Sequence, residues 1–146
     1  MYTLEKKFRF ESAHRLAKNY EGKCSSIHGH SWNGKVTVCM ERLNFQGMAV
    51  DFSVLGEFTK QLDKEYDHKL FLFEEDTDYV QMMEVVQTTK VVLFTDNPTS
   101  EVLARTIYGK LHTFLTERDI AFDYISVTED DTCTSSCTFN TGKSNP

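Results

Sequence analysis

Two histidines and a cysteine near the start of the chain have the types and spacing of a metal site. His28 and His30 flank a glycine in the stretch "CSSIHGH", and Cys24 precedes the first of them by four residues. Side chains two residues apart on an extended segment point to the same side, so both imidazoles can share one ion. Zinc accepts imidazole nitrogen and, in catalytic sites, is held by three protein ligands with one position open. The pair therefore predicts a zinc site that needs a third ligand from elsewhere.

His14 is the third ligand that we expect. Residues 2–13 alternate between apolar and polar side chains, which is typical of a strand with one wet face, and the even side of this run leads to His14. A second alternating run over residues 35–41 carries its even side back to His30 and His28. Both runs thus send histidines to one side of a sheet. Three neutral imidazoles leave the ion its full charge, which favours a catalytic site. The competing interpretation is that the H-x-H motif occurs at the surface by chance and binds no metal.

The role of Cys24 stays open at the level of residue type and spacing. As a fourth zinc ligand it would close the site and make it structural. Alternatively it acts as a nucleophile, or as a base whose thiol pKa is lowered by a nearby cation. A lone cysteine can also be inert. Its position four residues before the histidine pair favours one of the functional roles.

A second candidate for proton transfer is the dipeptide Asp67-His68. A carboxylate beside an imidazole can fix the tautomer of the ring and tune its pKa toward neutrality, as a general acid or base requires. The motif is short, and most such pairs are ordinary loop residues. Its position at the end of a predicted helix favours a role. His112 lies within another predicted helix, and we expect it to be exposed and without function.

Two amphipathic helices follow the strands that carry the histidines. Apolar residues recur at steps of three and four from Asp51 onward, in a helix that begins at Asp51 or Ser53 and ends near Asp67; they are Leu55, Phe58, Leu62 and Tyr66. A second helix opens in "NPTSEVLA", where Thr99 or Ser100 can cap it. Its apolar stripe is formed by Leu103, Ile107, Leu111 and Leu115.

The remaining segments are less regular. The last strand is predicted at about residues 122–129, ahead of a loop with the sequence "DDTCTSSC". Residues 71–95 are ambiguous, with "KVVLF" as a short strand among them. The order of strands and helices predicts an α+β fold, in which an antiparallel sheet carries both helices on one face.

The bulk composition excludes some classes of function. The 146 residues suit a single domain, 1–146, and the net charge of −6 argues against a protein that binds nucleic acid. No apolar run reaches membrane-spanning length, and the N-terminus lacks the apolar core of a signal peptide, so we expect a cytoplasmic protein. In that compartment the four cysteines are thiols rather than a disulfide framework.

Several stretches together resemble the family of 6-pyruvoyl-tetrahydropterin synthases and 6-carboxy-5,6,7,8-tetrahydropterin synthases. They are "FESAHRL", C-x3-H-G-H, "GMAVDFSVL", "YDHKL", "NPTSEVLA" and "TCTSSC", in that order, and they span almost the whole chain except for about 71–95. The resemblance implies the tunnelling fold (T-fold), with a four-stranded antiparallel sheet and two helices on one face. It also implies trimers whose sheets form a barrel, often stacked into hexamers, with active sites between subunits.

The resemblance also implies roles for individual residues. It places zinc on the three histidines 14, 28 and 30, and it matches Cys24 to the catalytic base. Asp67 and His68 then match a proton-transfer pair contributed by an adjacent subunit. A buried glutamate near the final strand holds the pterin ring in this family.

We assign that glutamate to Glu129 rather than to Asp131, because its longer side chain suits a bidentate grip on the ring. Thr99 and Ser100 help to hold the pterin. The triphosphate requires basic side chains, for which Lys23, Lys35 and Arg15 are candidates.

Two activities compete within the resemblance, and both start from 7,8-dihydroneopterin triphosphate. One yields 6-pyruvoyltetrahydropterin, and the other yields 6-carboxytetrahydropterin with loss of acetaldehyde, on the route to queuosine. The C-x3-H-G-H spacing and the "CTSSC" ending resemble the second, carboxy-forming type. Two rival interpretations lie outside these activities: a structural zinc protein closed by Cys24, and a pterin-binding oligomer without catalysis. The insert at about 71–95 is atypical of the family and could alter a subunit contact or the rim of the active site.

Overall fold

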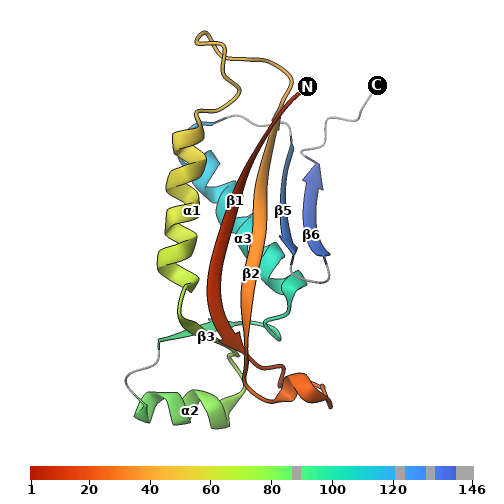
Figure 1. Cartoon of the computed structure of the whole chain (residues 1–146), viewed down its shortest axis with the longest axis vertical. Helices are drawn as coiled ribbons and strands as arrows, with labels where there is room; N and C mark the ends of the chain where they lie inside the picture. Colours follow the sequence, from red (N-terminus) through yellow and green to blue (C-terminus); the bar gives the residue numbers. More distant parts are fainter. Residues whose placement is uncertain (87–89, 121–123, 131–133, 141–146) are drawn as a thin grey trace.

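Six strands form one sheet, in the order β4-β3-β1-β2-β5-β6 (Figure 1). The computed structural model describes residues 1–86, 90–120, 124–130 and 134–140. The strands are β1 (Tyr2–His14), β2 (His28–Met40), β3 (Lys69–Phe73), β4 (Val91–Phe94), β5 (Tyr124–Asp130) and β6 (Thr134–Asn140). The helices are α1 (Phe52–Tyr66), α2 (Thr77–Val85) and α3 (Ser100–Thr116), with a short 3-10 turn η1 (Lys23–Ser25) between β1 and β2.

The sheet is mixed, which corrects the expectation of a purely antiparallel four-stranded sheet. Strands β1, β2, β5 and β6 are antiparallel neighbours, as expected. Strand β3, however, runs parallel to the end of β1, and β4 runs parallel to β3. Both additional strands are reached through a helix, α1 or α2, and a helical crossover returns the chain in the parallel direction. The segment that the sequence left ambiguous thus holds most of β3, all of α2, and β4, which is the predicted "KVVLF" strand.

The prediction that "DDTCTSSC" forms a loop is wrong for the second half of this stretch. Residues 134–140 form β6, which pairs with β5 from Asp130↔Thr134 to Tyr124↔Asn140. The run of serine and threonine lacks the alternation of apolar and polar side chains that identifies a strand in the sequence. Backbone hydrogen bonds to β5 define the strand instead, and these depend on tertiary pairing.

Helices α1 and α3 lie on the same side of the sheet and cover one face (Figure 1). The apolar stripes predicted for both helices are confirmed. None of the eight side chains that form them is more than 2% exposed. Burial of such a side chain contributes about 1.5–3 kcal/mol. Asp51 caps α1 by accepting a hydrogen bond from Ser53 N at 2.7 Å, and Thr99 caps α3 by accepting one from Val102 N at 3.3 Å.

The register between β1 and β2 positions the histidines. Ser12 lies opposite His30 and His14 opposite His28, one step beyond the aromatic pair Phe10↔Trp32. Paired residues on adjacent strands lie on the same face of the sheet. The hydrophobic core therefore continues directly into the histidine cluster. Among the described helices, none combines the length and apolarity that a membrane span needs.

Candidate functional site

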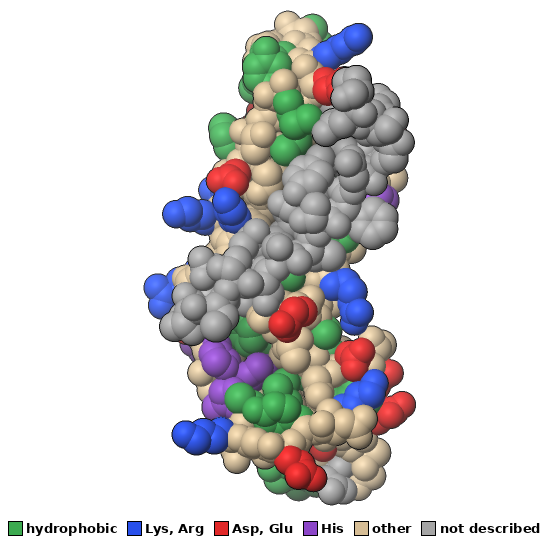
Figure 2. All heavy atoms as spheres, turned by 90° about the vertical axis from the view of Figure 1, so that its right-hand side faces the viewer, with side chains coloured by type: hydrophobic (Ala, Val, Ile, Leu, Met, Phe, Trp, Pro, Cys, Tyr) green, Lys and Arg blue, Asp and Glu red, His purple; other side chains and the backbone are tan. Residues whose placement is uncertain are grey.

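The three histidines that the sequence singled out converge at one end of the sheet. Their candidate ligand atoms all lie within 4.8 Å of one another. The ring centroid of His14 lies 4.5 Å from that of His28 and 4.8 Å from that of His30. The prediction that the two alternating runs send their histidines to one face is confirmed. Figure 2 shows histidine side chains gathered toward the lower end of the molecule, beside a hydrophobic patch.

Hydrogen bonds to backbone carbonyls orient two of these rings. His14 Nδ1 lies 2.6 Å from the Pro98 carbonyl oxygen, and His28 Nδ1 lies 2.8 Å from that of Ser26. A carbonyl oxygen only accepts, so both Nδ1 atoms carry the proton and donate it. Each Nε2 is then left with a lone pair, and the two Nε2 atoms face each other at 3.0 Å. Two facing lone pairs at this distance are suited to binding a cation between them.

A divalent metal fits this arrangement. Tetrahedral zinc bound to nitrogen at about 2.0–2.1 Å separates its ligand atoms by roughly 3.3 Å, close to the observed spacing. Burial, together with the neighbouring His28 and His30, lowers the pKa of His14 to about 4. The ring is therefore neutral at pH 7, which is the form that binds metal. His14, His28 and His30 would hold the ion.

The sulfur of Cys24 does not belong to this cluster, in which only the three histidines meet among the described residues. Cys24 lies in η1, half-buried, and its carbonyl oxygen accepts a hydrogen bond from Leu16 N at 2.8 Å. This bond holds the cysteine loop against the chain just beyond His14. A hydrogen bond with the Cys24 side chain also raises the pKa of Tyr20. The geometry gives no support to the role of fourth zinc ligand that the sequence left open.

Asp67 and His68 are fixed to the edge of β1 through Glu11. Asp67 Oδ1 accepts a hydrogen bond from Glu11 N at 2.9 Å, and His68 N donates one to Glu11 O at 2.7 Å. The second carboxylate oxygen, Asp67 Oδ2, accepts one from His68 Nδ1 at 2.6 Å. The bond from Glu11 N, followed by the one from His68, holds the pKa of Asp67 below its usual range. The His68 side chain is 80% exposed, so an oriented imidazole stands at the surface.

One groove brings the histidine cluster and this pair together. A cavity of about 670 Å³ is lined by His30 on one side and by His68 and Lys69 on another, with Ile27, Leu70 and Met83 among its apolar walls. A single chain therefore presents a candidate metal ligand, His30, and a candidate acid–base residue, His68, to the same groove. The contribution of His68 from an adjacent subunit stays a prediction. Lys69 was not singled out from the sequence, because a lone lysine carries no signal there.

The structure places the predicted pterin contacts as follows. Glu129 lies opposite Gly34 in the pairing of β5 with β2, whereas Asp131 falls outside the described residues. The Thr99 hydroxyl is engaged as the α3 cap, and Ser100 Oγ lies 3.5 Å from Glu101 Oε2. The roles of Glu129, Thr99 and Ser100 in binding pterin stay predictions. Sequence reasoning missed the hydrogen bond that His14 Nδ1 donates to Pro98 O, since the two partners lie far apart along the chain.

Two of the three basic candidates for the triphosphate already have acidic partners. Arg15 Nη1 lies 3.5 Å from Asp76 Oδ2, and both side chains are largely buried. Lys35 Nζ lies 2.6 Å from Glu5 Oε1. Lys23 is exposed at the start of η1. The choice among these candidates stays a prediction.

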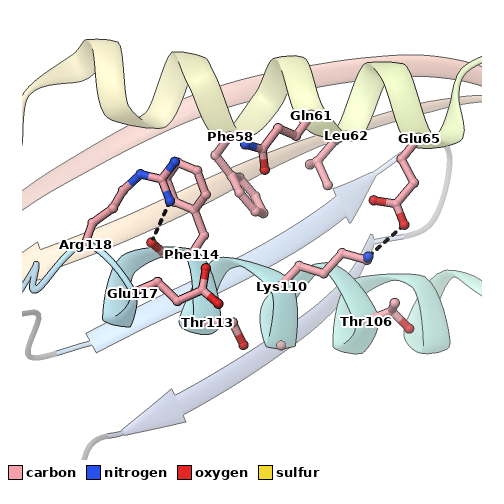
Figure 3. Close-up of a pocket in the computed structure, with 11 residues that line it drawn as sticks. Phe58, Gln61, Leu62, Glu65, Thr106, Lys110, Thr113, Phe114, Glu117 and Arg118 are labelled. Atoms are coloured by element: carbon pink, nitrogen blue, oxygen red, sulfur yellow. Dashed lines mark hydrogen bonds and ion pairs between the residues drawn. The ribbon is translucent and has the colours of Figure 1, made fainter.

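A second cavity, of about 570 Å³, lies between α1 and α3 (Figure 3). Its two basic side chains pair with carboxylates: Lys110 Nζ lies 2.7 Å from Glu65 Oε1, and Arg118 Nη2 lies 2.6 Å from Glu57 Oε1. None of the three clustered histidines lines it. It lacks the combination of metal ligands and an oriented acid–base pair found in the first groove.

Comparison with known proteins finds similar chains of one family. A family model described as 6-pyruvoyl tetrahydropterin synthase matches residues 3–141. The 6-carboxy-5,6,7,8-tetrahydropterin synthase of Bacillus subtilis is 30% identical over 142 residues, which cover 97% of this chain and 87% of that protein. The protein of the same name from Synechocystis is 35% identical over 115 residues, covering 76% of this chain and 75% of that one.

Solved structures share the fold at low sequence identity. A catalytic-residue mutant of Plasmodium vivax 6-pyruvoyltetrahydropterin synthase superposes with a TM-score of 0.72 and 18% identity, over 96% of this chain and 99% of that one. An uncharacterised protein of Wolinella succinogenes gives a TM-score of 0.77 at 17% identity, over 94% and 97%. At such identities the likeness concerns the fold alone.

Proposed function

This chain belongs to the 6-pyruvoyl tetrahydropterin synthase family, and on that premise we propose that it is a zinc-dependent 6-carboxy-5,6,7,8-tetrahydropterin synthase. This lyase converts 7,8-dihydroneopterin triphosphate to 6-carboxytetrahydropterin, acetaldehyde and triphosphate on the route to queuosine. The observation that carries the proposal is the pair of Nε2 atoms of His14 and His28, which face each other with lone pairs at 3.0 Å beside the groove of His68. The names of the curated relatives support the choice of the carboxy-forming reaction.

The three histidines would hold the ion, and one of them, His30, also lines the groove. Zinc bound there supplies a Lewis acid that polarises oxygen atoms of the substrate side chain. Imidazole ligands carry no charge, so this set preserves the charge of the ion more fully than thiolates or carboxylates would. The bonds of His14 to Pro98 O and of His28 to Ser26 O keep both rings in the tautomer that the metal requires.

We assign the proton transfers to Cys24 and to the Asp67–His68 pair. Cys24 as thiolate removes a proton from the side-chain carbon of the substrate. His68, oriented by the Asp67 carboxylate, passes protons to or from the hydroxyl groups. Glu129 holds the pterin ring, with Thr99 and Ser100 near it.

The proposed enzyme is a homo-oligomer, a trimer or hexamer, with active sites between subunits. Within the described sheet, the side of β1 away from β2 pairs with a strand, β3, only at Ser12–His14, so most of that edge is open there. Strand β6 is the last strand at the other end of the described sheet. Open strand edges readily pair with another chain, and joining β1 of one subunit to β6 of the next would close a barrel. The proposed location is the cytoplasm, where the Cys24 thiol stays reduced.

One assay tests the proposal against its alternatives. The purified, zinc-loaded chain is incubated with 7,8-dihydroneopterin triphosphate, and the products are identified by mass spectrometry. We expect 6-carboxytetrahydropterin and acetaldehyde. A 6-pyruvoyl product would instead favour the second candidate, whose name the Plasmodium vivax neighbour carries. Absence of any product with zinc bound would reject both enzymes and favour a structural zinc protein or a non-catalytic pterin-binding oligomer.

A further inference from the structure

Helix α2 lies beyond the end of the sheet at which β1 stops (Figure 1). It belongs to the segment that the sequence marked as an insert, and one of its side chains, Met83, lines the groove shared by His30 and His68. Tyr79 lies one turn earlier on the same face of the helix. Both are half-buried, whereas Met82 and Val85 are exposed at 45% and 83%. The helix therefore turns the Tyr79–Met83 face toward the protein.

An anchor holds this helix against the strand that carries His14. The guanidinium carbon of Arg15 lies 4.0 Å from the centre of the Tyr79 ring, a cation–π contact. The same guanidinium pairs with Asp76, at the N-terminus of α2, and the two side chains are only 16% and 9% exposed. Asp76 N also donates to Phe73 O at 3.0 Å, which ties the start of α2 to the end of β3. The position of Met83 is thus linked to the residue that follows a proposed metal ligand.

The chemistry of the wall indicates what it contacts. Met83, Ile27 and Leu70 offer only apolar surface to the groove, on which a triphosphate would be unfavourable. A thioether packs well against the face or edge of an aromatic ring and adapts to its shape. The charged end of a pterin triphosphate is therefore disfavoured at this wall, whereas the uncharged pterin ring is favoured there.

We infer that α2 forms one wall of the substrate pocket and that Met83 packs against the uncharged, pterin-bearing part of the substrate. The inference rests on the proposed function, and it assigns the insert to the rim of the active site. Met83 acts as a specificity-determining contact, and Arg15, Asp76 and Tyr79 act as positioning residues that hold it there.

The test compares two neighbouring methionines in the zinc-loaded full-length chain. The dissociation constant of 7,8-dihydroneopterin, measured by pterin fluorescence, and the KM of its triphosphate are compared for the wild type, Met83→Ala, Met83→Leu and the control Met82→Ala. We expect Met83→Ala to weaken both ligands by the same factor, about tenfold, because it removes several methylene-sized contacts from one pocket. Met83→Leu should restore most of the affinity. Met82→Ala should bind as the wild type does, since Met82 does not line the groove.

A second pair of variants tests the anchor. Tyr79→Ala removes the ring beneath Arg15 and should weaken both ligands in the same direction as Met83→Ala, with KM raised more than kcat is lowered. Tyr79→Phe keeps the aromatic face and should behave as the wild type. Circular dichroism spectra and melting temperatures of all variants verify that the fold is retained.

The outcomes separate this inference from the function on which it rests. If the wild type binds and converts the substrate while Met83→Ala binds both ligands equally well, the inference is wrong and the proposed function stands. Weakened binding of the triphosphate alone would place Met83 beside the charged end and would also overturn the inference. A wild type that binds neither pterin would overturn the proposed function and the inference together.

Discussion

His14 Nδ1 donates a hydrogen bond to the carbonyl oxygen of Pro98, with 2.6 Å between the two atoms. The bond joins the last residue of β1 to the turn that opens α3, although 84 positions separate the two residues. It fixes the tautomer of a buried imidazole, so that Nε2 offers its lone pair to the other histidines. The candidate metal site is therefore built by the packing of a helix terminus against a strand end.

Removal of one imidazole should abolish zinc binding. His30→Ala deletes a ligand of the cluster, and we expect zinc affinity to fall by more than about 100-fold, since even loss of an outer partner costs about 10–100-fold. The matched control is His112→Ala, because His112 lies exposed on α3 and outside the cluster. Zinc content after dialysis, measured by elemental analysis, checks the prediction. Equal zinc content in both variants would show that the cluster does not bind the metal.

Replacement of Cys24 should slow turnover without loss of metal. Cys24 lies outside the histidine cluster, so Cys24→Ala should retain zinc and bind substrate. Loss of a general base typically lowers the rate by about 10²–10⁴. Single-turnover product formation and zinc content are measured together, with Cys39→Ala as the control because Cys39 is buried in β2. Wild-type turnover in Cys24→Ala would remove this cysteine from the mechanism.

The Asp67 carboxylate should contribute to stability only while it is ionised. Its bond from Glu11 N holds its pKa in the folded protein below the ordinary value of 3.8. The stabilisation is therefore present above about pH 4 and is lost as the pH falls through the lowered pKa. Asp67→Asn cannot ionise, although its side-chain oxygen can still accept from Glu11 N.

Urea unfolding of the metal-free protein checks this behaviour from pH 7 to about pH 3. At pH 7 the free energy of unfolding should be larger for the wild type than for Asp67→Asn. This difference should shrink as the pH falls toward 3. A difference that stays constant over this range would contradict the assignment.

The aromatic cluster beneath the histidines should dominate the stability of this end of the sheet. Phe71 is fully buried, and its ring lies 5.3–6.3 Å, centre to centre, from those of Phe10, Trp32, Tyr66 and Phe94. Phe71→Ala should lower the free energy of unfolding by about 3–5 kcal/mol. Phe45→Ala is the control, since Phe45 is 97% exposed and its loss should change stability by less than about 0.5 kcal/mol. The free energy of unfolding of each variant, measured by chemical denaturation, checks both values.

Much of the fold could be predicted because local patterns reflect burial. Alternating residues identified β1 and β2, and steps of three and four identified α1 and α3. The same alternation put His14 on the face shared by His28 and His30. Every second residue of a regular strand lies on the same face of the sheet. Strand β6 and the helical insert escaped prediction, because a polar strand and a short helix carry no distinct apolar period.

The sequence by itself determined strands β1, β2, β4 and β5, the two large helices, the three clustered histidines and the resemblance to pterin synthases. Only the tertiary structure decided that His14 is oriented by Pro98, that Asp67 and His68 attach to Glu11, and that Met83 lines the groove of His30. The reason is physical: periodicity records which side of an element is buried, whereas these contacts depend on how distant elements pack. Such packing sets distances between side chains that have no fixed relation along the chain.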